Sequence, residues 1–127
     1  MKKILTNREI FTIGNAFEGA FQNDERYLPA KINFKIEKNK KNILDKMNEI
    51  EESRIKTIRE FGEEKDGQIQ IPNEKVEEVN KEIAELFDIE QEINIFMVSF
   101  EDIKNLEFTS AEMSALLFMI EDPEDEE

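Results

Sequence analysis

The first part of the chain carries apolar residues at the spacing of a helix. These positions are Ile10, Ile13, Phe17 and Phe21. They follow the motif Thr6-Asn7-Arg8-Glu9, in which the side chains of Thr6 and Glu9 satisfy backbone N–H groups reciprocally in a capping box. The pattern predicts a helix over residues 7–22. Gly14 within it leaves room for a neighbouring helix to approach closely.

A second helical pattern follows Pro29, a residue that suits the first turn of a helix because its missing N–H costs nothing there. One face of the predicted helix is apolar and consists of Ile32, Ile36, Ile43, Met47, Ile50, Ile58 and Phe61. Gly62 is suited to end it. Residues 31–37 also alternate between apolar and polar side chains, so a strand is the alternative there. The helical phase continues unbroken downstream and favours the helix.

The second half of the chain mixes short extended and helical patterns. Asp66-Gly67 is a turn signal, and residues 68–71 after it alternate as a strand does. Pro72 ends this strand, and Asn73 is suited to cap a helix that continues to Asp88. The apolar stripe of this helix consists of Val76, Val79, Ile83, Leu86 and Phe87.

The last segments add a strand and a helix. Residues 92–100 carry β-branched and aromatic side chains on both faces, which predicts a buried strand that pairs with residues 68–71. The segment 106–108 is a candidate for another short strand. A second capping box, Thr109-Ser110-Ala111-Glu112, starts a C-terminal helix that ends before Pro123.

Together these segments predict an α+β fold that is predominantly helical. A long helical hairpin over residues 7–61 is expected to pack on a small sheet with two further helices. Residues 1–120 are expected to form a single globular domain, because a chain of 127 residues has the length of one domain. Residues 121–127 carry six acids and are expected to form a disordered acidic tail.

The charge of the chain divides unevenly between its two halves. Residues 1–61 hold 10 acidic and 13 basic side chains, whereas residues 62–127 hold 21 acidic and 4 basic ones. The formal net charge of -14 therefore belongs to a slightly basic half joined to a strongly acidic one. This asymmetry points to a charged partner and says nothing about the fold.

The composition excludes several kinds of chemistry. The chain has no Cys and no His, so disulfides, thiolate zinc sites, cysteine nucleophiles and Ser-His-Asp catalysis are excluded. No segment has the apolar length of a membrane helix or of a signal peptide. We therefore expect a soluble cytoplasmic protein that is not an enzyme, has no cofactor and has no membrane partner.

Carboxylate pairs are the remaining route to a metal site. Glu49/Glu52 and Glu82/Glu85 have the Glu-x-x-Glu spacing that holds Mg²⁺ in helical nucleotide hydrolases. The chain holds six such pairs, against about four expected by chance for its glutamate content at this one-face spacing. A carboxylate Mg-dependent nucleotide hydrolase is therefore only the third functional hypothesis, and no residue is assigned as a metal ligand.

Two charged surfaces suggest contact with a partner. Lysines are dense at positions 31, 35, 38, 40 and 41, but the overall charge opposes approach to DNA and argues against direct nucleic-acid binding. Their simpler interpretation is a solvated helix face, docked against the acidic half. The candidate acidic contact residues are Glu74, Glu77, Glu78, Glu85, Glu101 and Asp102. They suggest an acidic nucleic-acid mimic, although glutamate is also a good helix former and Lys81 interrupts the row, paired with Glu77 and Glu85.

An apolar contact surface is the other candidate. Phe34 and Ile55 lie off the main apolar stripe of the long helix, and this helix is longer than a small globule needs. A second apolar stripe is typical of a partner surface, and it leaves a homo-oligomer open. The alternative is that neighbouring helices of the same chain cover both residues.

Four segments carry a resemblance to a known family. They are Leu5-Thr6-Asn7-Arg8-Glu9-Ile10-Phe11, Tyr27-Leu28-Pro29-Ala30-Lys31-Ile32-Asn33-Phe34, Leu86-Phe87-Asp88-Ile89-Glu90-Gln91-Glu92, and the stretch from Ala111-Glu112-Met113 to Leu117-Phe118-Met119-Ile120. The chain resembles, over nearly its whole length, small phage and prophage proteins of Gram-positive bacteria that are known only as a domain of unknown function. The resemblance implies viral infection of a bacterium as the setting and brings no catalytic residue.

The leading functional hypothesis is a non-enzymatic, phage-encoded protein that acts by protein–protein contact. Virion assembly and interference with a host or defence protein both fit it. The runner-up is the acidic mimic, which would inhibit a DNA- or RNA-binding host protein. The expected location is the cytoplasm of the infected bacterium, with the virion as the alternative. The sequence does not identify the protein partner.

Overall fold

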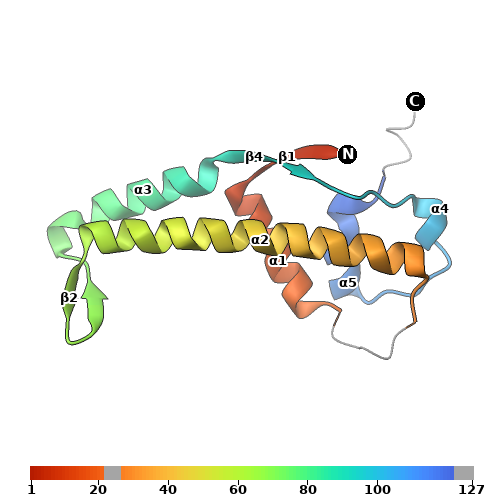
Figure 1. The fold of residues 1–127 in the computed structure, drawn as a ribbon, viewed down its shortest axis with the longest axis horizontal. Helices are drawn as coiled ribbons and strands as arrows, with labels where there is room; N and C mark the ends of the chain where they lie inside the picture. The colour runs from red at the N-terminus through yellow and green to blue at the C-terminus, as the bar shows by residue number, and fades with distance from the viewer. Residues whose placement is uncertain (22–26, 122–127) are drawn as a thin grey trace.

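One long helix sets the shape of the molecule, and its axis follows the long axis of the whole structure (Figure 1). The computed structural model describes residues 1–21 and 27–121. The elements in chain order are β1 (Lys2–Thr6), α1 (Asn7–Gly19), α2 (Ala30–Phe61), β2 (Glu63–Lys65), β3 (Gln68–Gln70), η1 (Asn73–Lys75), α3 (Val76–Asp88), β4 (Glu90–Asn94), α4 (Phe100–Ile103), α5 (Ser110–Leu116) and η2 (Leu117–Met119). The prediction of a predominantly helical α+β fold with a small sheet is confirmed.

Both predicted capping boxes form. The backbone N–H of Glu9 donates to Thr6 Oγ1 at 3.1 Å, and the N–H of Thr6 donates to Glu9 Oε1 at 3.0 Å. Thr109 and Glu112 repeat the arrangement at the start of α5. α1 ends at Gly19, three residues before the predicted end, and Gln22 lies outside the described residues.

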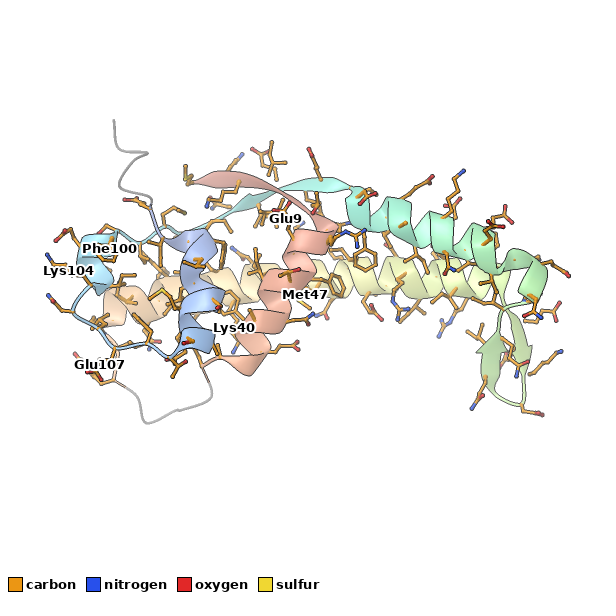
Figure 2. The ribbon with its side chains drawn as sticks, turned by 180° about the vertical axis from the view of Figure 1, so that it is seen from behind. Glu9, Lys40, Met47, Phe100, Lys104 and Glu107 are labelled. Atoms are coloured by element: carbon orange, nitrogen blue, oxygen red, sulfur yellow. The ribbon has the colours of Figure 1, made fainter. Side chains whose placement is uncertain are left out.

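α2 is a helix throughout, so the alternative strand over residues 31–37 was wrong. Its buried face consists of Ile32, Ile36, Asn39, Ile43, Met47 and Ile50. Gly62 ends the helix, with its N–H donating to the C=O of Ile58 at 2.8 Å. Where α1 crosses α2, a β-carbon at Gly14 would collide with the side chain of Met47 (Figure 2). The predicted close approach of a helix at Gly14 is confirmed.

The strand pairing differs from the prediction. β4 pairs antiparallel with β1, in a register that sets Ile4 opposite Glu92, whereas residues 68–71 were expected to be its partner. β3 pairs with β2 instead, because Asp66 and Gly67 both adopt positive φ, 52° and 78°, which is the geometry of a two-residue hairpin turn. The chain thus contains two separate two-stranded sheets within the described residues.

Three further predictions were wrong in the second half. The strand predicted over residues 92–100 is only Glu90–Asn94, because the backbone of Phe96 bonds to the side chain of Asn39 and leaves the ladder. The segment 106–108 is a loop that packs against the core and forms no strand. Asn73 does not cap a helix: it begins the short η1 turn, and neither η1 nor α3 has a side-chain cap.

The core lies around the first half of α2. α1, α5 and the segment after β4 pack there, and no residue of α2 beyond Ile50 is buried. The second half of α2 packs against α3, on which only Val79 is buried. Residues 51–61 of α2 and helix α3 therefore form a thin two-helix projection, here called the arm, with the β2–β3 hairpin at its end (Figure 1).

None of the helices in the described part of the chain is both long and apolar enough to cross a membrane. The predicted acidic tail, residues 121–127, lies outside the described residues except for Glu121. The N–H of Glu121 donates to the C=O of Val98 at 2.8 Å.

Candidate functional site

The acidic side chains of the arm share one exposed surface. It is called the acidic face of α3 and consists of Glu74, Glu77, Glu78, Glu82 and Glu85. In the described parts of the chain, none of these carboxylates forms an ion pair, and the expected pairs of Lys81 with Glu77 and Glu85 do not form. The face therefore presents five carboxylates and the exposed Lys81, a net negative charge, to the solvent.

Glu101 and Asp102 lie apart from this face. They belong to α4, at the opposite end of α2 from the arm (Figure 1). Glu101 pairs with Lys104 at 2.6 Å, and Asp102 pairs with Lys31 at 3.4 Å. Hydrogen bonds from Ser99 and then from Lys31 lower the pKa of Asp102. The structure thus does not bring the six predicted acidic residues together, and it neutralises two of them locally.

A groove between α1 and α3 adjoins the acidic face. This α1–α3 groove has a volume of about 440 Å³ and is lined by Arg8, Phe11, Thr12, Asn15, Asn80, Ile83, Ala84 and Phe87. Its floor is aromatic: the rings of Phe11 and Phe87 meet edge to face, with centroids 5.1 Å apart. The Arg8 guanidinium lies 5.9 Å from the centroid of Phe87 and pairs with Asp88 at 3.3 Å.

The groove was not predicted from the sequence. Phe11 and Phe87 belong to helices far apart in the chain, and nothing in either local pattern says that these two helices are neighbours. The available signal was the apolar stripe of α3, which continues to Phe87 at its C-terminal end. The stripe alone does not show what it packs against, and Phe87 and Ile83 are only half-buried.

Phe34 and Ile55 are both exposed, so the alternative that neighbouring helices of the same chain cover them does not hold in the described residues. Phe34 is 55% and Ile55 37% exposed, and a separation of 21 residues places them about 31 Å apart along α2. Each lines a shallow groove formed by α2 alone, of about 500 Å³ around Phe34 and about 530 Å³ around Ile55. The Phe34 ring meets Phe96 edge to face at 6.0 Å, and Lys38 Nζ lies 5.6 Å from its centroid.

Three of the five clustered lysines interact with their own chain. Lys31 pairs with Asp102, Lys35 Nζ donates to the C=O of Met97 at 2.8 Å, and Lys38 lies over the Phe34 ring. Lys31 and Lys35 thus hold the first half of α2 against the segment that follows β4. This arrangement agrees with the simpler interpretation of the lysine cluster.

The carboxylate pairs do not converge on a common point. Among the described residues, no three acidic side chains come together in a way that would hold a metal ion. Glu49 pairs with Lys46 at 3.5 Å, and Glu82 and Glu85 are exposed on the acidic face of α3.

No protein-family model, no curated protein and no solved structure matches the chain.

Proposed function

We propose that the chain is a non-enzymatic protein that acts by contact with another protein, through the α1–α3 groove and the adjoining acidic face of α3. The observation that carries the proposal is that the groove and the acidic face adjoin each other on α3. Phe11, Ile83 and Phe87 are half-buried on the groove floor, and the neighbouring carboxylates form no ion pair within residues 1–21 and 27–121. A partner protein could insert an apolar side chain into the groove and place Lys or Arg residues against the acidic face, so it would match both surfaces.

The polar rim of the groove supports a protein ligand. Asn15, Asn80 and Thr12 line it beside the aromatic floor. Amide and hydroxyl groups around an apolar floor are typical of protein interfaces, where the centre excludes water and the rim hydrogen-bonds. The resemblance to phage proteins supports infection of a bacterium as the setting. The partner is then a virion component or a host or defence protein.

The test compares capture of proteins from infected-cell lysate by the full chain and by two variants. Ala84→Arg places a charged side chain in the groove without touching the core, since Ala84 is exposed. Leu117→Arg is the matched control, because Leu117 is a 64% exposed apolar residue on η2, away from the groove. We expect A84R to lose the captured protein and L117R to keep it. Equal capture by both variants would contradict the proposed surface.

The acidic mimic is the second candidate, and the net negative charge on α3 favours it. The exposed Glu63, Glu64 and Asp66 of the β2–β3 hairpin extend that charge at the end of the arm. A mimic binds mainly through charge, so its complex should dissociate in about 0.5 M salt, where the Debye length is only a few ångströms. Glu77→Lys with Glu78→Lys should then abolish binding, whereas Glu107→Lys at the other end should not. Binding that survives high salt and depends on Ala84 would exclude the mimic.

A further inference from the structure

One whole side of α2 is exposed from Phe34 to Arg59. This surface is called the outer face of α2 and consists of Phe34, Glu37, Lys38, Lys41, Asp45, Asn48, Glu49, Glu52, Ile55, Lys56 and Arg59, all of which are exposed. Successive residues turn by about 100°, so these positions lie opposite the buried face. α2 lies in front of α1 and α5 in Figure 1 and behind them in Figure 2. The Phe96 ring meets Phe34 edge to face at one end of this face.

Two apolar residues, Phe34 and Ile55, lie near opposite ends of this face. Phe34 and Ile55 are equidistant from the midpoint between Leu44 and Asp45. A second copy of α2 that runs antiparallel, about a two-fold axis at this midpoint, sets Phe34 of each copy against Ile55 of the other. One two-fold symmetric contact would then contain two equivalent Phe34–Ile55 pairs and would cover both residues in each copy.

The lysines and most of the glutamates on this face are complementary about the same axis, whereas Glu37 of each copy lies opposite Glu52 of the other and the two copies of Asp45 lie beside each other. Residues 38–41 include three lysines and no acid, and residues 49–52 include three glutamates and no base. The two-fold axis at residues 44 and 45 places these segments opposite each other. Lys38 and Lys41 of each copy fall within about one helical turn of Glu49 and Glu52 of the other. A parallel, in-register pairing would instead set lysine against lysine and glutamate against glutamate, which is repulsive.

From this complementarity we infer that a second copy of the chain packs antiparallel on the outer face of α2 and forms a two-fold symmetric dimer. The contact lies on a different face from the α1–α3 groove, so it goes beyond the proposed function and stands or falls separately. The dimer also places the lysine-rich first half of α2 near glutamates of the second copy.

The oligomeric state of the full chain tests this first. Sedimentation velocity over a wide concentration range should show a dimer of twice the chain mass that dissociates on dilution. Phe34→Glu and Ile55→Glu should each weaken dimerisation about tenfold or more, because each buries a charge at two places. Leu117→Glu, on another exposed apolar residue away from this face, should leave the dimer unchanged. A monomer at every concentration, or a dimer indifferent to F34E and I55E, overturns the inference.

A charge exchange tests the pairing. Lys41→Glu alone and Glu49→Lys alone should each weaken the dimer, because each sets like charges together at two places. A mixture of the two variants should restore it, because in a mixed dimer each introduced charge meets its opposite and the two unchanged residues still attract. Failure of the mixture to associate better than either variant alone overturns the register.

Disulfide trapping tests the antiparallel direction, since the chain has no cysteine of its own. Chains carrying F34C and I55C are mixed and oxidised, with L117C as the control for random collision. We expect the mixed F34C–I55C disulfide to exceed both same-variant disulfides and the control. An excess of same-variant disulfides indicates a parallel dimer, and no excess over L117C indicates no contact. Either result overturns the inference.

Discussion

The side-chain amide of Asn39 makes two hydrogen bonds to the backbone of Phe96. Asn39 Nδ2 donates to the C=O of Phe96 at 2.8 Å, and the N–H of Phe96 donates to Asn39 Oδ1 at 2.8 Å. Asn39 is fully buried in the middle of α2. Its amide therefore takes the place of a neighbouring strand for a backbone segment that has left the β1–β4 ladder.

Asn39→Ala should lower the free energy of unfolding by about 2–4 kcal/mol, because two backbone groups of Phe96 lose their partners in a buried place. Urea denaturation measures this loss. Asn33→Ala, at an exposed position on the same helix, is the control and should change stability by less than about 0.5 kcal/mol. Equal losses in the two variants would show that the Phe96 backbone finds other partners.

Asn7 joins the start of α1 to the junction between α3 and β4. Its Nδ2 donates to the C=O of Leu86 at 2.8 Å, and its Oδ1 accepts from Gln91 Nε2 at 2.7 Å. Asn7→Asp keeps the shape but cannot donate to Leu86, so we expect a loss of about 1–3 kcal/mol. Hydrogen exchange should accelerate at the C-terminal end of α3. Asn105→Asp, in an exposed loop, should leave the exchange there unaltered.

Gly14→Ala tests the crossing of α1 and α2. Alanine is the better helix former by about 1 kcal/mol, but its β-carbon would collide with Met47. We expect G14A to destabilise the native chain and to become neutral or stabilising when Met47→Ala has removed the obstacle, a coupling of about 0.5–3 kcal/mol. Gly19→Ala is the control, because a β-carbon at Gly19 meets nothing within 4 Å. Additive effects of the two substitutions at the crossing would contradict the steric explanation.

The Glu51–Arg54 pair should make the stability of the folded chain depend weakly on pH. Hydrogen bonds from Arg54 lower the pKa of Glu51 in the folded chain. A folded pKa below the unfolded value stabilises the protein at pH above the unfolded pKa, and this contribution is lost as the pH falls through the folded pKa. Both side chains are about a third exposed, 39% and 35%, so solvent screening limits the effect to about 0.5 kcal/mol.

Titration of the Glu51 carboxyl by NMR checks this sign. We expect a midpoint below the ordinary value of glutamate in the native chain, and a rise in that midpoint in Arg54→Gln. A midpoint that does not move in R54Q would mean that Arg54 does not hold the carboxylate.

The helices were predictable because their signals are local. Thr6 and Thr109 each stand three residues before a glutamate, and the phase of the α2 stripe continues over the whole helix. The same phase placed Phe34 and Ile55 off the main stripe, but it did not decide whether a neighbouring helix covers them. Each of these inferences needs only residues within a turn or two of one another.

The sheet and the groove were not predictable, because they depend on contacts between distant segments. β1 holds only two apolar residues, Ile4 and Leu5, so its sequence pattern does not indicate a strand. The partner of β1 is β4. The segment 68–71, which was expected to pair with β4, pairs instead with β2 across the Asp66-Gly67 turn. The six acidic candidates were grouped by charge alone, and α3 and α4 lie at opposite ends of α2.

The pairing of β1 with β4 has a consequence for synthesis on the ribosome. β1 leaves the exit tunnel before β4, and Leu5 can meet Gln91 only after α1, α2 and α3 have been translated. α2 can form as soon as it emerges, because its hydrogen bonds are local, while the ladder waits for a contact of high sequence separation. The order of translation thus lets α1, α2 and α3 form before the β1–β4 ladder can close.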